Sequence, residues 1–260
     1  MSPPIPRSHP RYRSLVTREK LVAAAHEGLV AWEGLIAHGR GEAFDYLLGE
    51  RTLPEAEKAA RAAVASLLRA ERPVLSVNGN VAVLAGDEIG ALAAATGARV
   101  EVNLFHRTEE RVRALVALLQ THGVREVLGE DPDASLPGLE HSRALCSRRG
   151  IYAADVVLVP LEDGDRAEAL IRMNKAVLSI DLNPLSRTSR AATIAIVDDL
   201  GRALSNMVAF AKEAKGHPKA LEAAYGAYRK QANLRGVLRA IQRHLETRAA
   251  TGGRGAGNNV

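Results

Sequence analysis

Cysteine and aromatic residues are scarce in this sequence, and long hydrophobic runs are missing. Cys146 is its only cysteine, so neither an internal disulfide nor a cysteine-based zinc site can form. Aromatic residues make up 3% of the chain, which argues against recognition of nucleic-acid bases by stacking. No stretch approaches the ~18 apolar residues that span a bilayer, and the first residues lack the apolar core of a signal peptide. We therefore expect a cytoplasmic protein without a membrane segment, stabilised by aliphatic packing.

The excess of positive charge is confined to one part of the chain. Lys and Arg total 35 against 30 Asp and Glu, which gives a formal net charge of +5. Residues 218–248 alone carry a net +5, so the rest of the chain is balanced. Arg235, Arg239 and Arg243 repeat every four residues there and share one helix face. Such a face could bind RNA, but it more often faces water or covers a dimer surface, so nucleic acid is not the favoured partner.

Short β-rich runs alternate with amphipathic segments in the middle of the chain. The runs are too short and too apolar for surface strands, so each is predicted to be a buried strand. They span residues 74–77, 99–104, 126–128, 155–159, 176–180 and 193–197. The predicted helices between them include residues 81–95, 108–121 and 165–173. Strand alternating with helix predicts an α/β fold with a doubly wound, mostly parallel, Rossmann-like sheet.

Four parts are predicted along the chain. Residues 1–72 form a helical N-terminal segment packed on the core, and residues 73–215 form the Rossmann-like core. Residues 216–250 form basic C-terminal helices, and residues 251–260, rich in Gly and Asn, form a disordered tail.

Three local features are predicted within these parts. Residues 38–41 should form a flexible basic turn between two helices. The spacing of Thr52 and Glu55 matches a capping box and predicts a helix that runs to about residue 70. Residues 129–150 are long, polar and irregular, which indicates an ordered excursion or lid.

The familiar glycine-rich phosphate cradles are missing from the predicted sheet. The sequence contains no Walker A signature, no G-x-G-x-x-G after a strand, no H-E-x-x-H and no G-x-S-x-G. Residues 252–257 match the dinucleotide pattern only superficially, because no strand precedes them. A nucleotide bound to this sheet must therefore have its phosphates held by arginines and helix N-termini.

Two predicted strands end in polar turns that lead into a helix. Residues 76–80 supply two side-chain amides and a glycine, which fits either simple turn chemistry or ligand binding. Thr108 is predicted to cap the next helix, with His106 and Arg107 directly before it. A helix N-terminus beside an arginine can bind a phosphate or a carboxylate. A solvated surface turn is the alternative, and both interpretations stay open.

Two further strand ends carry charged residues. Glu162 and Asp163 could hold Mg²⁺, which needs few protein ligands, whereas Asp165 is better explained as a helix cap. Residues 181–190 combine an aspartate with hydroxyls and two arginines, which suits either phosphate binding or a solvated loop. Asp199 is predicted to cap the last helix of the core or to accept hydrogen bonds from a ribose or adenine edge.

Six blocks of sequence stand in the same order as in a known family. They are SHPRY (8–12), GLIAHGRGEAFDY (34–46), SVNGN (76–80), NLFHRTEER (103–111), VLVPLEDGD (157–165) and DLNPLSR (181–187). Together they resemble the archaeal-type 4-phosphopantoate:β-alanine ligases, also called phosphopantothenate synthetases. The likeness runs from about Ser8 to Lys215, and the shared order of several blocks makes it specific.

The resemblance implies an enzyme of coenzyme A biosynthesis. Members of the family join 4-phosphopantoate to β-alanine with ATP, and the products are 4′-phosphopantothenate, AMP and diphosphate. The resemblance also implies a homodimer with a Rossmann-like sheet. We further expect an acyl-adenylate intermediate and a Mg²⁺ ion that bridges phosphate oxygens. The alternative is a Rossmann-like protein that binds a nucleotide or a phosphorylated metabolite without turnover.

The resemblance also assigns residues to ATP. They are Arg18, Arg40, Asp181, Leu182, Asn183, Arg187, Thr188, Asp199 and Leu200. 4-Phosphopantoate and ATP, the reactants of the first step, are both anions, so cations must bring them together and stabilise the transition state. We therefore expect Arg18, Arg40 and Arg187 to converge on the triphosphate at the rim of the sheet.

The remaining site residues are hypotheses. The 4-phosphate of the substrate is placed near Asn80, His106 and Arg107, and catalytic roles are assigned to Arg187 and Asn80. The amine of β-alanine must lose a proton, and Asp163 or a phosphate oxygen is a candidate base. The metal ligands stay unassigned.

Overall fold

The centre of the structure, a computed structural model that describes residues 5–214, 216 and 218–251, is a parallel sheet of six strands. Its strands are β1 (Pro73–Val77), β2 (Arg99–Val102), β3 (Val127–Leu128), β6 (Val156–Pro160), β7 (Ala176–Ile180) and β8 (Ile194–Ile196). Their order across the sheet is β3-β2-β1-β6-β7-β8, and all neighbouring pairs are parallel. This order is that of a doubly wound Rossmann sheet and confirms the predicted fold class.

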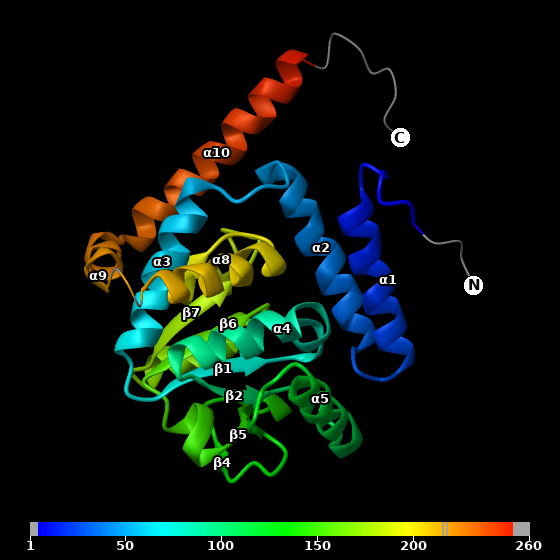
Figure 1. Ribbon diagram of the computed structural model, residues 1–260, viewed down its shortest axis with the longest axis vertical. Coiled ribbons are helices and arrows are strands. Elements are labelled where there is room, and N and C mark those ends of the chain that lie inside the picture. Colours follow the sequence, from blue (N-terminus) through cyan, green and yellow to red (C-terminus); the bar gives the residue numbers. More distant parts are fainter. Residues whose placement is uncertain (1–4, 215, 217, 252–260) are drawn as a thin grey trace.

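Helices and an irregular segment cover both faces of the sheet (Figure 1). One core includes side chains of α3 (Pro54–Arg69), α4 (Gly79–Thr96), α5 (Glu109–Thr121) and α8 (Leu200–Glu213). The other includes side chains of α6 (Gly164–Arg172), of residues 134–154 and of the end of α7 (Arg187–Ala191). Along β6, Leu158 packs into the first core and its neighbours Val157 and Val159 into the second. Burial on both faces explains why the strands have continuous apolar sequences.

The excursion predicted at residues 129–150 is ordered and continues to Tyr152. Within it lie β4 (Ala134–Ser135) and β5 (Leu145–Cys146), which pair antiparallel, a short 3₁₀ helix (Ser142–Ala144) and a π-helical turn (Arg148–Tyr152). The buried carboxylate of Glu101, on β2, accepts hydrogen bonds from the backbone N–H groups of Ser147 (2.7 Å) and Ile151 (2.6 Å). These bonds fix the excursion to the sheet.

Two helices, α1 (Tyr12–His26) and α2 (Trp32–Leu48), stand beside the sheet (Figure 1). The prediction of a flexible turn at residues 38–41 is wrong, because these residues lie inside α2. Small residues let α2 approach its neighbours. A Cβ at Gly41 would meet Leu182, and one at Gly34 would lie 2.5 Å from the Asn80 side chain. Packing therefore outweighs the low helix propensity of glycine.

The predicted capping box is wrong although the helix itself is confirmed. Helix α3 begins at Pro54 with Leu53 as its N-cap, and no side chain caps it. The hydroxyl of Thr52 instead donates to Asp198, at 2.6 Å, near the carboxyl end of β8. A contact between distant segments thus replaces the local bond that the spacing predicts.

The predicted caps of three core helices have different outcomes. The side chains of Thr108 and Asp199 accept hydrogen bonds from the backbone at the starts of α5 and α8, which confirms both caps. The prediction for Asp165 is wrong, because it lies inside the first turn of α6 and its carboxylate pairs with His141 at 2.9 Å.

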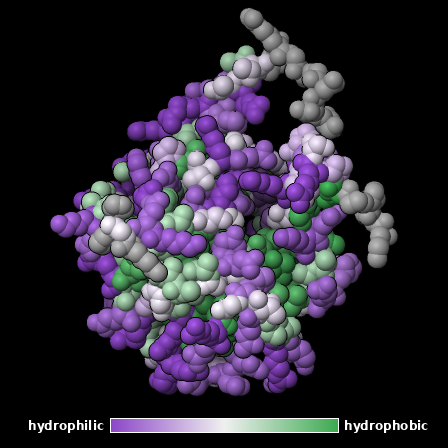
Figure 2. All heavy atoms as spheres, in the orientation of Figure 1, coloured by the Kyte–Doolittle hydropathy of each residue, from purple (hydrophilic) through white to green (hydrophobic). Residues whose placement is uncertain are grey.

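The chain continues from the core into α9 (Pro218–Ala227) and α10 (Lys230–Thr251). Leu234 and Val237 of α10 pack with side chains of α2 and β8, and the far half of α10 extends away from the core (Figure 1). Hydrophilic side chains cover most of the face in Figure 2, with apolar patches between them. No helix in the described residues is long and apolar enough to cross a membrane. The tail predicted at 251–260 falls, after Thr251, outside the described residues.

Candidate active site

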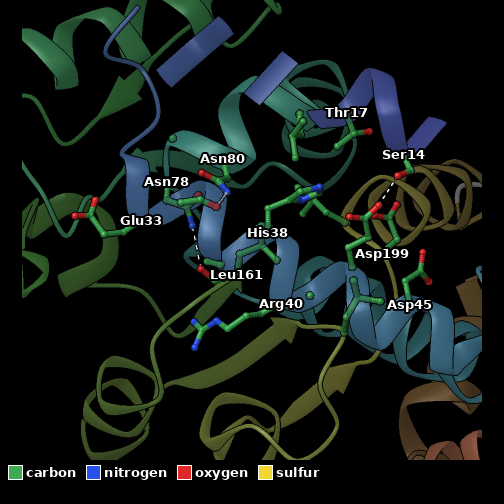
Figure 3. A pocket seen from close by; sticks show the side chains of 18 of the residues that line it. Ser14, Thr17, Glu33, His38, Arg40, Asp45, Asn78, Asn80, Leu161 and Asp199 are labelled. Carbon is green, nitrogen blue, oxygen red and sulfur yellow. Dashed lines mark hydrogen bonds between the residues drawn. The ribbon is translucent and has the colours of Figure 1, made fainter. Parts of the chain in front are cut away.

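A cleft of about 810 Å³ opens at the carboxyl ends of the strands, beside α1 and α2. It includes the ends of β1 and β6, which are neighbours in the sheet although β1 is followed along the chain by β2. In doubly wound sheets, ligands bind where the strand order reverses in this way. Figure 3 shows Asn78 and Asn80 on one side of the cleft, Asp45 and Asp199 on the other, and His38 between them.

The turn between β1 and α4 forms one wall of the cleft. Asn78 caps α4 and donates from Nδ2 to the carbonyls of Pro160 (3.2 Å) and Leu161 (3.1 Å), so it ties the ends of β1 and β6 together. Asn80 donates from Nδ2 to the carbonyl of Gly34, at 2.9 Å, and ties α4 to α2. Both amides therefore have structural bonds, and both also line the cleft.

Helix α2 supplies the opposite wall. Arg40 lines the cleft and makes no ion pair with any residue in the described part of the chain. Burial lowers the pKa of His38, which favours the neutral imidazole at neutral pH. Arg18, on α1, lies behind this wall, where its Nη2 is 2.7 Å from a carboxylate oxygen of Glu42. Glu42 itself lines the cleft, so Arg18 borders the cleft without lining it.

The ends of β7 and β8 form the third part of the cleft. Leu182, Asp199 and Leu200 line it. Asp181 accepts hydrogen bonds from the Ser186 hydroxyl (2.5 Å) and the Asn183 backbone (2.9 Å), and burial raises its pKa. These bonds shape the loop that carries Leu182 into the cleft.

Thr188 and Arg187 lie on the far side of that loop. The hydroxyl of Thr188 is buried and donates to the carbonyl of Glu162 at 2.7 Å. Arg187 is exposed, pairs with Glu168 at 2.9 Å, and lines a second cavity of about 690 Å³. The expected convergence of three arginines is therefore not present within one chain, because Arg40 and Arg187 line different cavities.

The turn before α5 contributes to the cleft differently from the expectation. His106 lines the cleft, and its Nε2 is 3.5 Å from Glu33 of α2. Arg107 does not line it, because its Nη2 donates to the carbonyls of Gly129 (2.6 Å) and Glu130 (2.9 Å) at the start of the excursion. Burial lowers the pKa of Arg107.

Several arginines that line the cleft were not predicted from the sequence, among them Arg111, Arg143 and Arg202. Arg111, on α5, and Arg202, on α8, sit in helix sequences that look like ordinary solvated faces. Arg202 is held by Asp45 of α2 at 2.5 Å, and this pair outweighs the opposing effect of burial, so its pKa is raised. Arg143 comes from the excursion, far along the chain from the other lining residues. No local signal in the sequence places it there.

The carboxylates that line the cleft do not cluster into a metal site by themselves. In the chain as described, no group of three or more His, Cys, Asp or Glu side chains could hold a metal ion. Asp163 and Asp199 both line the cleft. A Mg²⁺ ion bound to nucleotide phosphates keeps most of its waters and needs only one or two protein carboxylates, so these residues suit such an ion.

Comparison with known proteins identifies the family. A family model described as phosphopantothenate/pantothenate synthetase matches residues 55–244. The chain belongs to this family. A protein of Methanosarcina mazei named 4-phosphopantoate–beta-alanine ligase is 57% identical over 96% of this chain and 98% of its own length. Relatives with the same name occur in Thermococcus kodakarensis (56% identical over 83% of each chain) and Methanospirillum hungatei (58% identical over 80% of this chain and 85% of the relative).

Membership in the phosphopantothenate synthetase family gives the cleft its context. Of the residues that the sequence analysis assigned to ATP, Arg40, Leu182, Asp199 and Leu200 line this cleft. The other five do not line it. Four of these, Arg18, Asp181, Asn183 and Thr188, support its walls or lie behind them. The fifth, Arg187, lines the second cavity.

Proposed function

We propose that this chain is an ATP-dependent ligase that joins 4-phosphopantoate to β-alanine in coenzyme A biosynthesis. The observation that carries the proposal is the 57% identity to a relative named for this reaction, over nearly the full length of both chains. The cleft supports it, because Arg40, Arg111 and Arg143 supply positive charge for ATP and 4-phosphopantoate, which are both anions.

The reaction divides into two steps that conserve atoms and charge. A carboxylate oxygen of 4-phosphopantoate attacks the α-phosphorus of ATP, and diphosphate leaves. The neutral amine of β-alanine then attacks the acyl carbon of the adenylate, an amide bond forms, and AMP leaves. The amine gives up a proton in this step, and a phosphate oxygen of the adenylate is our candidate acceptor, because Asp163 lies 3.4 Å from Arg143, away from the residues assigned to ATP.

ATP is assigned to the end of the cleft formed by β7, β8 and α2. Arg40 there forms no ion pair among the described residues, so its guanidinium is available for phosphate oxygens. Leu182 and Leu200 offer apolar surface, and Asp199 lies at the N-terminus of α8. In this assignment Asp199 would hold a Mg²⁺ ion, which would neutralise part of the phosphate charge.

Two arginines assigned to ATP need a change of partner to reach it. Arg18 is held by Glu42, and Arg187 by Glu168. Arg187 is exposed, and exposed ion pairs are weak, so exchange of Glu168 for a phosphate is feasible. Arg18 is partly buried and bonds the largely buried Glu42 through two nitrogens, so its exchange costs more free energy. For Arg187, the start of α7 must also turn toward a cleft, in the same chain or in the second chain of the proposed homodimer.

Exchange of labelled diphosphate into ATP tests the first step. We expect exchange with ATP and 4-phosphopantoate alone, and release of AMP only when β-alanine is added. Exchange that requires β-alanine would contradict the adenylate. Nucleotide binding without any turnover would instead support the alternative of a non-catalytic sensor.

A further inference from the structure

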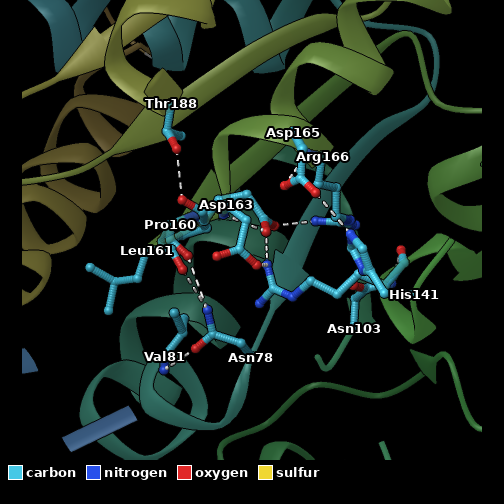
Figure 4. Close-up of polar contacts among 12 residues, drawn as sticks. Asn78, Val81, Asn103, His141, Pro160, Leu161, Asp163, Asp165, Arg166 and Thr188 are labelled. Atoms are coloured by element: carbon cyan, nitrogen blue, oxygen red, sulfur yellow. Dashed lines mark hydrogen bonds and ion pairs between the residues drawn. The ribbon is translucent and has the colours of Figure 1, made fainter. Parts of the chain in front are cut away.

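A cluster of charged side chains is buried beside the end of β6 (Figure 4). Arg166 is 0% exposed and Arg143 is 5% exposed. The carboxylate of Glu162, whose side chain is also buried, forms ion pairs with both guanidinium groups. Because a buried charge is costly unless it is paired, two cations that share one buried anion leave positive charge without a full partner.

The surroundings of the two arginines show where that charge lies. Arg166 lies in the attractive field of the buried Glu101. Asp163 and Asp165 attract both arginines, but these carboxylates are partly exposed and therefore screened by water, with Asp163 3.4 Å from Arg143. Arg143 is in addition repelled by Arg166. Burial lowers the pKa of each arginine to about 10, so both stay protonated at neutral pH. The less compensated cation is Arg143.

Arg143 also has hydrogen-bonding capacity to spare. A guanidinium carries five N–H donors. Within the described residues, Nε of Arg143 has no hydrogen-bond partner, and Nη1 meets the carboxylates of Glu162 and Asp163. Arg143 lines the cleft, whereas Arg166 does not. Of the two buried arginines, therefore, only Arg143 can be reached by an anion in the cleft.

Further donors lie on the same wall of the cleft. Asn78, the N-cap of α4, is bonded to the carbonyl of Leu161, the residue before Glu162, so the N-terminus of α4 adjoins the charged cluster (Figure 4). Arg111 also lines the cleft, and its Nη2 lies 3.0 Å from the position of a Cβ on Gly79, the first residue of α4. Backbone carbonyls hold the other two nitrogens of Arg111 in place.

We propose that Arg143, together with Arg111 and the N-terminus of α4, binds the phosphomonoester of the acyl substrate. This inference rests on the proposed function, in which ATP lies at the opposite end of the cleft near Arg40 and Asp199. The carboxylate of the acyl substrate must reach the α-phosphate there, so the phosphomonoester, at the other end of that molecule, points toward Arg143. A phosphate dianion supplies the negative charge that the cluster lacks. Arg107, occupied by backbone carbonyls, is not needed for this role.

Calorimetric titration with 4-phosphopantoate and with unphosphorylated pantoate tests the inference. Arg143→Met removes the charge and leaves Glu162 and Arg166 as a one-to-one pair, so the fold and its melting temperature should be retained. The wild type should prefer 4-phosphopantoate, and this preference, measured as the ratio of the Kd for pantoate to the Kd for 4-phosphopantoate, should be about 100-fold smaller in the variant. The affinity of the variant for ATP should equal that of the wild type.

Arg166→Met is the matched control. It removes the other buried partner of Glu162 at a position that does not line the cleft. We expect a lower melting temperature, and a preference for the phosphorylated ligand that stays within about twofold of the wild type. Arg143→Lys serves if the methionine variant does not fold, because it keeps the charge, loses the planar fork, and should lower the preference by about tenfold.

An unchanged preference in a folded Arg143 variant would overturn the inference. So would weaker binding of ATP or β-alanine with the preference intact, because Arg143 would then serve another anion. Loss of the fold in both Arg143 variants would also overturn it, because the residue would be structural. Titration needs no turnover, so failure of the proposed function, seen as no AMP release by the wild type, is a separate result.

Discussion

Single residues fix the segments around the sheet through carboxylates that accept backbone N–H groups. Asp155, just before β6, accepts hydrogen bonds from the backbone of Glu71 (2.8 Å) and Arg72 (2.9 Å), which lead into β1. Burial opposes ionisation of Asp155, but these bonds outweigh it and hold its pKa below the ordinary value. Asp155 thereby aligns the starts of two neighbouring strands.

The lowered pKa of Asp155 predicts how stability depends on pH. The contribution of this carboxylate is fully present above its unfolded pKa of about 3.9 and is lost as the pH falls through the lower folded value. Asp155→Asn should lower the free energy of unfolding at pH 7 by about 1–3 kcal/mol. Urea unfolding at pH 7, 5 and 3 checks this: the difference from the wild type should shrink at pH 3. An equal difference at all three values would contradict it.

At the scale of elements, the close approach of α4 to the loop after α1 depends on one glycine. A Cβ on Gly79 would lie 2.4 Å from the backbone carbonyl oxygen of Leu29, which cannot move without shifting the chain. Gly39, in α2, differs, because a Cβ there would meet nothing within 4 Å. The two positions form a natural pair for comparison.

Substitution of these glycines by alanine should have opposite effects on stability. Gly79→Ala should cost about 1–3 kcal/mol through overpacking and displace the N-terminus of α4 from the cleft. Gly39→Ala should stabilise α2 by about 0.5–1 kcal/mol, because alanine is the better helix former. Thermal unfolding measures both. A Gly79→Ala variant as stable as the wild type would mean that the loop after α1 adapts without a cost in free energy.

At the scale of the whole molecule, the two cavities separate residues that the family resemblance groups together. Arg40 lines the large cleft, while Arg187 lines the second cavity with Arg172. A role for Arg187 in phosphate binding therefore requires either movement of α7 or a second chain. The oligomeric state, proposed to be a homodimer, is measurable by light scattering.

Variants of the second cavity test this proposal directly. Arg187→Ala should reduce diphosphate exchange by about 10²–10³-fold, the cost of removing a donor to a charged transition state, while the fold is unchanged. Arg172→Ala, which removes a neighbouring exposed arginine, should leave exchange near the wild-type rate. If both variants are fully active, Arg187 has no part in ATP binding.

The sequence predicted the parts of the structure that depend on local patterns. The apolar runs predicted all six strands of the main sheet, because strands buried on both faces have no polar side to alternate. The caps Thr108 and Asp199 could also be predicted from the sequence, because each side chain accepts a hydrogen bond from the first turn of the helix that it caps. The family followed from six ordered blocks and is confirmed by the relatives.

Only the tertiary structure decided which side chains of distant segments contact one another. Thr52 donates a hydrogen bond to Asp198 and does not cap its own helix, and α2 stays helical through its glycines because it packs closely. Arg107 is bonded to backbone carbonyls of the excursion, whereas Arg143, from the excursion, lines the cleft. None of these outcomes leaves a local pattern, because each depends on residues brought together only by the crossovers of the sheet. The amino-acid order alone thus determined the elements and the family, and long-range packing determined which charges face the cleft.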